Sequence, residues 1–514
     1  MAYLLGCDAG TGGAKSVIID EQGTVLGSHF VEYPLYTPRP GIAEQHPEDL
    51  WKAAAETMRV SLEKAQIRPQ DIAAVSSSAQ APASILIDKN RQPLKPAHIW
   101  MDRRAVEQCQ WLKEHIGADW IRRLTGNDVI DPFFGLTKVL WDRDNEPELY
   151  QRAIKSLNLK DFILMRLTGV ICTDSTSATL AGIAFDARRK DWDDDMLKAI
   201  GLERSKLPEM RPSREVVGAV THEAAAECGL LEGTPVTCGV FDGPAAWLSM
   251  GAIDDGDSVL TLGSSAIWAA VHQEPVFVPG LLTFENVADP NTYITAAATS
   301  SAGALLRWFR DQFGNLEQAM AAQLGLDPYD LLTTQAEKAP PGSDGLVILP
   351  YFMGERMPIW DCTARGVMFG LSLLHTRAHV IRALMESAGY SVCHIVKRAQ
   401  EYGIASSKPT AMVEGGARSP LWRQIISDIC GIHTVFMAGA QGAPFGDAII
   451  AGVGVGVFDS YRVVKDWLKF SDYSQPHPDT HALYQQLFEL YLRIYESQRD
   501  NFQELDRIYS TRGE

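Results

Sequence analysis

The chain has 514 residues, of which 46% are hydrophobic and 22% charged, and its formal net charge is −17. This length predicts two to four domains with buried cores, and the ordinary apolar content excludes a mainly disordered chain. The excess of 64 acidic over 47 basic residues argues against a surface for nucleic acid or anionic membrane, although backbone N–H groups can still hold a phosphate locally.

The cysteines and the N-terminus bear on the compartment. Eight cysteines are scattered with no C-x-x-C pair, which is typical of a reducing cytoplasm. The first residues lack the basic segment of a secretory signal, and the longest apolar stretch, residues 448–458, is far shorter than the roughly 20 residues that cross a bilayer. We therefore expect a cytoplasmic protein that binds neither nucleic acid nor membrane.

The N-terminal half predicts strands and helices in a mixed α/β layer fold. Alternating apolar residues and turn signals predict strands over Tyr3–Cys7, Ala14–Ile19, Thr24–Val31, Ile72–Ser77 and Ser84–Asp88. We expect the last two of these strands to pair with each other. Proline suits the first position of a helix, and apolar residues recur at helical spacing after Pro47. A second helix is expected near Arg103–His115.

The C-terminal half repeats this opening. Ser258–Val271 again has an apolar strand, a turn of small residues and a second apolar strand. The polar, glycine-rich stretch Gly251–Asp257 suggests a boundary just before this repeat. We expect an N-terminal domain over residues 1–248, a C-terminal domain over 249–458 and a helical extension over 459–514, where Leu483, Leu487 and Leu490 recur at helical spacing.

Two of the predicted turns have the composition of a phosphate-binding loop. Asp8-Ala-Gly-Thr-Gly-Gly13 places Gly10, Thr11 and Gly12 between two strands, with Lys15 close by. Glycines allow successive N–H groups to converge on phosphate oxygens, and a carboxylate such as Asp8 suits Mg²⁺. The same glycines also suit a tight hairpin without a ligand. The usual P-loop, dinucleotide, protein-kinase and hydrolase motifs do not occur.

Several motifs together resemble the FGGY family of carbohydrate kinases, in its xylulokinase-like form. The matching stretches run collinearly from residue 3 to about residue 458, and they are Asp8-Ala-Gly-Thr-Gly12, Trp100-Met-Asp-Arg-Arg104, Phe134-Gly-Leu-Thr-Lys-Val-Leu-Trp141, Gly354-Glu-Arg-Met-Pro358, Arg365–Leu371, His375–Glu386, Glu414–Trp422 and Gln441–Ala448. The resemblance implies two actin-like (ribonuclease H-like) α/β domains that close over an interdomain cleft.

The resemblance also implies an activity. Such kinases transfer the γ-phosphate of ATP, with Mg²⁺, to a hydroxyl group of a sugar or polyol. Asp242 in Val240–Ala246 matches the family's catalytic aspartate and would be the general base. Asp8 and Asp242 would face the metal, and the phosphates would be held by two groups of residues: Gly10, Thr11, Gly12 and Lys15 of the first loop, and Gly263, Ser264 and Ser265 of the second.

The family's nucleotide side matches Gly415, Gly416 and Ala417, which would lie against the adenosine. Ser419 and Pro420 follow at once, and they equally suit the N-cap and first residue of a helix. We therefore interpret those two residues as structural. The resemblance leaves a homodimer open.

The sugar side departs from the family pattern. Xylulokinase-like members tend to have Gln-Met-His-Gly where this chain has Gln80-Ala81-Pro82-Ala83, and Gly-Asp-Asn where it has Phe241-Asp242-Gly243. Trp100, Asp102 and Arg104 keep the family pattern and are candidate sugar ligands. The resemblance implies a ketopentose such as D-xylulose as acceptor, and the lost partners leave ribulose, a hexulose, a polyol or an aldonate open.

Two other activities stay open. An actin-like ATPase would share the phosphate loops and need no small acceptor, although the signature over 354–386 is that of the carbohydrate kinases. A relative that has lost activity could bind a sugar without turning it over. His375 and His379, four residues apart, have no third metal ligand nearby, so we do not expect a metal there.

Overall fold

The computed structural model describes residues 2–510 and divides them into two compact units. Unit 1 comprises residues 2–253, Phe284–Tyr293 and Gln441–Leu468. Unit 2 comprises Asp254–Thr283, Ile294–Ala440 and residues 469–510. The chain thus returns to unit 1 twice after first leaving it. The domain boundaries after residues 248 and 458 stay a prediction.

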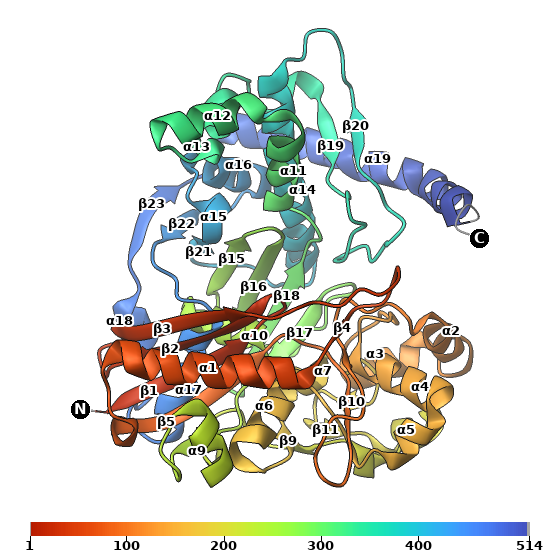
Figure 1. Ribbon diagram of the computed structural model, residues 1–514. Coiled ribbons are helices and arrows are strands. Elements are labelled where there is room, and N and C mark those ends of the chain that lie inside the picture. The colour runs from red at the N-terminus through yellow and green to blue at the C-terminus, as the bar shows by residue number, and fades with distance from the viewer. Residues whose placement is uncertain (1, 511–514) are drawn as a thin grey trace. The chain divides into compact units, whose positions relative to one another are not determined.

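A six-stranded mixed sheet forms the centre of unit 1 (Figure 1). Its strands, in spatial order, are β13 (Val216–Ala219), β14 (Pro235–Thr237), β5 (Ile72–Ala79), β1 (Tyr3–Ala9), β2 (Gly13–Ile19) and β3 (Val25–Glu32). The hairpin β1–β2 is antiparallel and pairs Asp8 with Lys15, whereas β5 runs parallel to β1. These strands confirm the predicted ones. The predicted pairing of 72–77 with 84–88 is wrong, because β6 (Ile85–Ile87) pairs with β8 (Lys155–Leu157).

Helices cover both faces of this sheet. Side chains alternate between the faces along β1, so Leu5 and Cys7 pack with α1 (Pro47–Ala65) and Leu4 packs with α17 (Ala443–Gly454). Gly6 allows α17 to lie directly against β1, since a Cβ atom there would come within 1.9 Å of the Pro444 carbonyl oxygen. Segment 441–468 is therefore part of unit 1, although it follows unit 2 residues in the chain.

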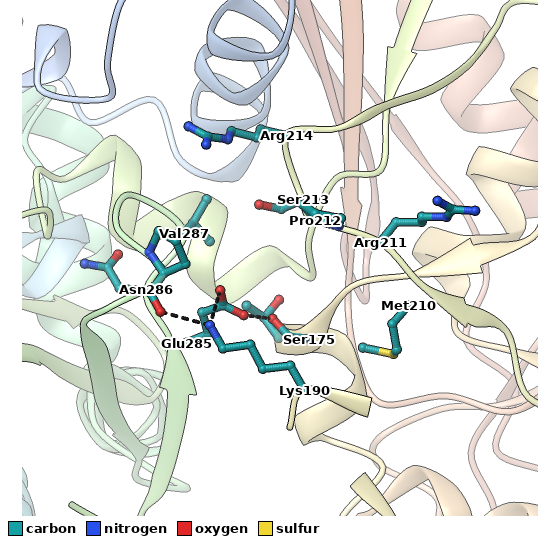
Figure 2. A pocket seen from close by; sticks show the side chains of 12 residues that line it. Ser175, Lys190, Met210, Arg211, Pro212, Ser213, Arg214, Glu285, Asn286 and Val287 are labelled. Carbon is teal, nitrogen blue, oxygen red and sulfur yellow. Dashed lines mark hydrogen bonds and ion pairs between the residues drawn. The ribbon is translucent and has the colours of Figure 1, made fainter. Parts of the chain in front are cut away.

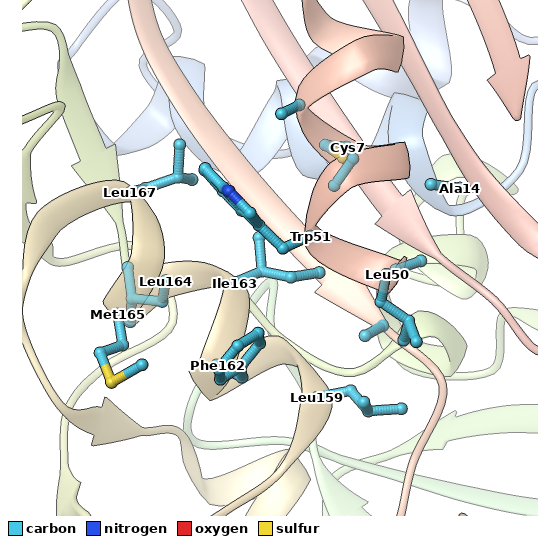
Figure 3. Packing of buried hydrophobic residues seen from close by; sticks show 14 of the residues in the cluster. Cys7, Ala14, Leu50, Trp51, Leu159, Phe162, Ile163, Leu164, Met165 and Leu167 are labelled. Atoms are coloured by element: carbon cyan, nitrogen blue, oxygen red, sulfur yellow. The ribbon is translucent and has the colours of Figure 1, made fainter. Parts of the chain in front are cut away.

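The largest core cluster of unit 1 lies under α1. Figure 3 shows Trp51 of α1 beside Ile163 and Leu167 of α6 (Leu159–Thr168), with Phe162 below them. The other helices of unit 1 are α2 (Val106–His115), α3 (Ala118–Thr125), α4 (Gly135–Asn145), α5 (Pro147–Arg152), α7 (Ser175–Thr179), α8 (Asp194–Ile200), α9 (His222–Cys228), α10 (Asp242–Ser249) and α18 (Val463–Trp467). The predicted helices after Pro47 and near Arg103–His115 are confirmed.

A seven-stranded sheet forms the centre of unit 2. Its strands, in spatial order, are β17 (Leu282–Glu285), β18 (Tyr293–Ala298), β16 (Ala266–His272), β15 (Ser258–Leu262), β21 (Thr410–Val413), β22 (Thr434–Met437) and β23 (Phe470–Ser474). The hairpin β15–β16 is antiparallel, and β21 and β22 continue parallel to β15, as β5 and β14 continue parallel to β1 in unit 1. Six strands of this sheet thus repeat the strand order of unit 1, and β17 is an additional edge strand.

The helices of unit 2 include one long C-terminal helix. They are α11 (Gly303–Phe313), α12 (Asn315–Leu324), α13 (Pro328–Ala336), α14 (Arg377–Glu401), α15 (Glu414–Ala417), α16 (Pro420–Cys430) and α19 (Pro478–Ser510). The extension after residue 458 is not wholly helical, because β23 adds an antiparallel strand to β22. Its residues are mostly polar and exposed, so the sequence carried little apolar alternation to indicate a strand.

Candidate active site

The first glycine loop closes the hairpin β1–β2 and forms the centre of a hydrogen-bond network. The N–H of Gly10 donates to the carbonyl of Gly13 at 3.0 Å, and the Tyr33 hydroxyl donates to the carbonyl of Gly10. The hydroxyl of Thr11 donates to Gln80 Oε1 and accepts from Trp100 Nε1, both at 2.9 Å. Thr11 therefore joins three loops that are far apart in the sequence.

Three aspartates influence one another beside this loop. The Ser78 hydroxyl lies 2.9 Å from Asp8 Oδ1 and 2.7 Å from Asp447 Oδ2. Burial raises the pKa of Asp8 to about 6, against the opposing effects of Ser78 and Lys15. Burial and the charge on Asp8 raise the pKa of Asp242 to about 8. Burial, followed by the charge on Asp8, also raises the pKa of Asp447 well above its usual value.

Asp242 is the first residue of α10, where backbone N–H groups favour the charged carboxylate and limit the rise in its pKa. Sequence reasoning missed Asp447, because Gln441–Ala448 resembled a loop on the nucleotide side. A signal was present, since Asp447 is the single charged residue of an otherwise apolar helix. Within residues 2–510, no three His, Cys, Asp or Glu side chains gather closely enough to hold a metal ion by themselves.

The predicted sugar ligands lie close to the first glycine loop and are strongly hydrogen-bonded. Gln80 is 2% exposed, and its Nε2 donates to Gln45 Oε1 at 2.6 Å. Asp102 Oδ1 accepts from Arg104 Nε at 2.8 Å, while Arg104 Nη2 also donates to Glu44 at 2.5 Å. These pairs hold the loops in place. Gln45 and Glu44 were missed by sequence reasoning.

Two other predicted sugar-side residues offer no polar side chain. Ala81 is half-buried and Pro82 is buried, next to the end of β5. Lys138, in the stretch that ends at Trp141, is fully buried, and its ammonium donates to the backbone carbonyls of Asp102 and Pro132. Lys138 therefore fixes the backbone at Asp102, a predicted sugar ligand.

In unit 2 the second predicted turn and the predicted nucleotide glycines line one cavity of about 370 Å³. Gly263 and Ser264 come from the turn after β15, and Gly415 and Gly416 come from α15. Ser265 and Ala417 are not among its lining residues, and Ala417 is fully buried. The turn is closed by the Gly303 N–H, which donates to the Gly263 carbonyl at 2.8 Å.

The same cavity has walls that sequence reasoning missed. Arg307 of α11 donates to the Ser264 hydroxyl at 2.9 Å, and Asp327, Tyr329 and Asp330 from the start of α13 also line the cavity. Ser419 caps α16 by accepting from the Trp422 N–H at 3.2 Å, which confirms the predicted N-cap, and it also lines the cavity. The volume lies within the usual range of sites for small molecules.

Two family models together match most of the chain. The N-terminal domain of the FGGY family of carbohydrate kinases matches residues 3–249, and the C-terminal domain of that family matches residues 258–455. The chain belongs to the FGGY family of carbohydrate kinases. It is therefore a sugar kinase with two actin-like domains, and FGGY kinases use ATP as phosphate donor and small-molecule sugars as acceptors.

Individual FGGY kinases resemble the chain along almost its whole length. Gluconokinase of Bacillus subtilis is 30% identical over 494 residues, covering 96% of this chain and 95% of that protein. Xylulose kinase of Lactococcus lactis is 31% identical over 501 residues, covering 97% of both. The crystal structure of ligand-bound xylulose kinase from Lactobacillus acidophilus has a TM-score of 0.90 at 26% identity and covers 98% of this chain and all of that one.

The segment His375–Glu386, which resembles an FGGY signature, forms part of the framework of unit 2. Glu386 of α14 is 1% exposed and accepts from the Gly342 N–H, the Ser343 hydroxyl and the Tyr484 hydroxyl at 2.7–2.9 Å. His379 lies within hydrogen-bond distance of Thr376 at the start of the same helix. In residues 2–510 no helix is both long and apolar enough to span a bilayer.

Proposed function

We propose that this FGGY kinase transfers the γ-phosphate of ATP to a hydroxyl group of D-xylulose, with Asp242 as the general base. The observation that carries this proposal is the position of Asp242, which begins α10 beside Asp8; burial and the charge on Asp8 raise the pKa of its carboxylate to about 8. A raised pKa makes the carboxylate a stronger base for the proton that the attacking hydroxyl loses. Because phosphoryl transfer needs little covalent help from a protein, the main contribution of this chain would be to hold Asp242 in position.

The nucleotide would bind in the cavity of unit 2. Gly415 would let the adenosine approach the backbone beside Gly416, while the turn Gly263–Ser265 and Arg307 would supply donors for phosphate oxygens. In unit 1, Gly10, Thr11, Gly12 and Lys15 would meet the transferred phosphate. The cationic and N–H donors on the two sides account for an anionic ligand in a chain with a net charge of −17.

Asp8 and Asp242 fit a Mg²⁺ ion. Their carboxylates interact strongly enough for one charge to raise the pKa of the other, and this repulsion favours a bound cation. Mg²⁺ is usually held by one or two carboxylates together with substrate phosphates, so Asp8 and Asp242 would suffice as its protein ligands. Such an ion would neutralise charge on the phosphates during transfer.

The acceptor is the least constrained part of the proposal. D-xylulose comes first because relatives of nearly full coverage are xylulose kinases. D-gluconate is the second candidate, since the gluconokinase of Bacillus subtilis is equally similar. Ala81 and Pro82 replace two potential hydrogen-bond partners for hydroxyl groups, and this change supports testing ribulose, hexuloses and polyols as well.

A coupled ADP-release assay over these acceptors, with ATP and Mg²⁺, tests the proposal. We expect the highest kcat/KM with D-xylulose, and a loss of about 100-fold or more in Asp242→Asn. Asp195→Asn changes an exposed carboxylate of α8 in the same unit and should leave the rate unchanged. Full activity of Asp242→Asn would place the base elsewhere, and a higher kcat/KM with D-gluconate would favour the second candidate.

Two further outcomes would reject the kinase proposal as a whole. ADP release that does not depend on any acceptor would indicate an ATPase, and acceptor binding without ADP release would indicate a sugar-binding protein. A homodimer and a cytoplasmic location also stay predictions. Light scattering of the purified chain and localisation of a tagged copy would check them.

A further inference from the structure

The helix α12 of unit 2 presents apolar side chains to solvent. Leu316, Met320 and Leu324 of this helix are between 42% and 62% exposed, and so are Phe313 just before it and Leu326 just after it. The spacing of four residues places Leu316, Met320 and Leu324 in one row along the helix. A surface helix normally turns such a row towards the core of its own domain, so an exposed row indicates a contact with another molecule. The cavity of unit 1 in Figure 2 offers no comparable signal, because its wall is closed by the pairing of Glu285 with Lys190.

The one charged residue of α12 lies on the buried side of the helix. Glu317 is the single charged residue of the segment 312–326, and it is 2% exposed. Its carboxylate accepts from Gln335 of α13 and from Arg377 of α14, the second at 2.9 Å. Its charge is therefore satisfied inside unit 2, and the exposed side of α12 holds only apolar and uncharged polar side chains.

A second group of exposed apolar residues borders this row. Leu371, Leu373 and Leu374, in the turn before α14, are each at least 61% exposed. The ion pair of Glu317 with Arg377, the first residue of α14, links this turn to α12, and both lie at the same end of unit 2 (Figure 1). These three leucines and the five apolar residues of the segment 313–326 together form one apolar surface, the α12 surface.

The size of the α12 surface is that of a protein interface. A side chain of this kind has an area of about 200 Å² when it is fully accessible, so the exposed fractions correspond to roughly 1,000 Å² in total. The largest apolar patch of a typical monomer is about 300–600 Å², and each partner contributes about 800 Å² to a standard interface. The α12 surface is thus large enough for one half of a stable dimer.

Symmetry and charge both select a second copy of this chain as the partner. The row is symmetric about Met320, since Leu316 and Leu324 lie four residues to either side. An antiparallel pair of α12 helices about a two-fold axis therefore sets Met320 against its own copy and Leu316 against the partner subunit's Leu324. Two chains with a net charge of −17 also repel, and a surface without exposed charge brings no like charges together.

We propose that the α12 surface joins two copies of this chain in an isologous dimer, with the two-fold axis beside Met320. The dimer forms without ATP or acceptor, because every residue of the surface belongs to the fold of unit 2. The inference goes beyond the proposed function, since it holds for any acceptor of this kinase.

Analytical ultracentrifugation of the purified chain, without ligands, measures the association. We expect the wild-type chain to have twice the mass of one chain at micromolar concentration. Leu316→Glu/Leu324→Glu places four carboxylates in the interface and should raise the Kd of the dimer by about 100-fold or more. Val106→Glu/Leu231→Glu changes two exposed apolar residues of unit 1 and should stay dimeric. A monomeric wild-type chain, or an equally tight dimer of the first double variant, would overturn the proposal.

Cross-linking tests the position of the two-fold axis. Cys362 is exposed and the other seven cysteines are buried, so the variants are made in a Cys362→Ser chain. Met320→Cys should give a covalent dimer with a short bismaleimide, because two copies meet at this residue. Ala322→Cys, exposed on another side of the same helix, should stay uncrosslinked. Absence of the covalent dimer in Met320→Cys, or an equal yield in Ala322→Cys, would overturn the arrangement. Neither measurement needs turnover, so a wrong acceptor or base leaves both results interpretable.

Discussion

At the residue scale, one hydroxyl group shared by two carboxylates determines the protonation state of Asp447. Ser78 has a single hydroxyl hydrogen, yet its oxygen lies within hydrogen-bond distance of both Asp8 and Asp447. Asp447 is fully buried, and its Oδ1 has no partner within the described residues. The arrangement is satisfied when Asp447 is a neutral acid that donates to Ser78, while Ser78 donates to Asp8.

The substitution Asp447→Asn should therefore be tolerated. An amide of the same shape can also donate to Ser78, so we expect the free energy of unfolding to change by less than about 0.5 kcal/mol. Asp447→Ala removes the partner of Ser78 and should cost roughly 1–3 kcal/mol. Chemical denaturation of both variants, with the exposed Asp459→Asn as control, measures this. An equal loss in Asp447→Asn and Asp447→Ala would show that a charged carboxylate is required.

The buried carboxylate of Glu355 in unit 2 should make the stability of the fold depend on pH. The Glu355 carboxylate is 5% exposed and accepts from the N–H groups of Ser300 and Arg356, and burial raises its pKa from 4.5 to about 7. Because the folded state holds this proton more tightly than the unfolded state, the group stabilises fully below pH 4.5. That stabilisation is lost as the pH rises through about 7, and it amounts to roughly 3 kcal/mol.

Glu355→Gln removes this titration. The difference in unfolding free energy between the wild-type chain and the variant should decrease as the pH is raised from 5 to 8, in denaturant titrations at fixed ionic strength. Glu489→Gln, at an exposed position of α19, serves as the control and should follow the wild-type curve. Parallel curves for wild type and Glu355→Gln would mean that Glu355 stays ionised when folded.

At the element scale, the short helix α15 contains two adjacent glycines, Gly415 and Gly416, with different surroundings. A Cβ atom at Gly416 would come within 2.7 Å of the Leu262 side chain and 2.8 Å of its carbonyl oxygen. A Cβ atom at Gly415 would meet nothing within 4 Å, although Gly415 lines the cavity of unit 2. One glycine is thus required by packing, and the other leaves space in the cavity.

Alanine at the two positions should give opposite results. Gly415→Ala should raise the KM for ATP several-fold and leave the melting temperature within about 1 °C, because the new methyl group enters only the cavity. Gly416→Ala should destabilise unit 2 by roughly 1–3 kcal/mol, since backbone must move. Thermal unfolding and ATP titrations of both variants provide the test. An unchanged KM in Gly415→Ala would argue against nucleotide at this helix.

The elements that sequence predicted are the ones set by local pattern. Both hairpins combine apolar alternation with turns of small residues, and α16 begins with Ser419 and Pro420, so each signal lies within a few residues. β23 was missed because its polar strand depends on pairing with β22. The return of 441–468 to unit 1 was missed because nothing local records that Gly6 lies against α17.

The residues of the candidate site were likewise predicted where a local motif marks them and missed where they depend on contacts between distant segments. Family motifs pointed to Gly263 and Gly416, which the fold brings to one cavity. Arg307 and Tyr329 of that cavity lie in helices whose residues look like any exposed helix surface in sequence. Gln45 was missed likewise, because its role depends on contact with Gln80, 35 residues away. Contacts between distant segments, unlike turns, leave no sequence spacing to recognise.

At the scale of the whole molecule, the two units share one order of six strands, and each carries one set of candidate residues. The hairpin turn of unit 1 lies with Asp8 and Gln80, and the hairpin turn of unit 2 lies with Gly415. The candidate residues divide between the units, because those proposed for the acceptor belong to unit 1 and the cavity proposed for the nucleotide is lined by residues of unit 2.

This separation predicts independent effects of substitutions in the two units. Gln80→Ala removes hydrogen bonds to Thr11 and Gln45 and should raise the KM for the acceptor roughly tenfold without changing the KM for ATP. Gly415→Ala should do the reverse. In the double variant, the effects on kcat/KM should multiply, with an interaction energy below about 0.5 kcal/mol, because Gln80 and Gly415 belong to different compact units. Steady-state kinetics with both substrates varied gives this energy, and a value above about 1 kcal/mol would show that the two units bind their ligands as one coupled site.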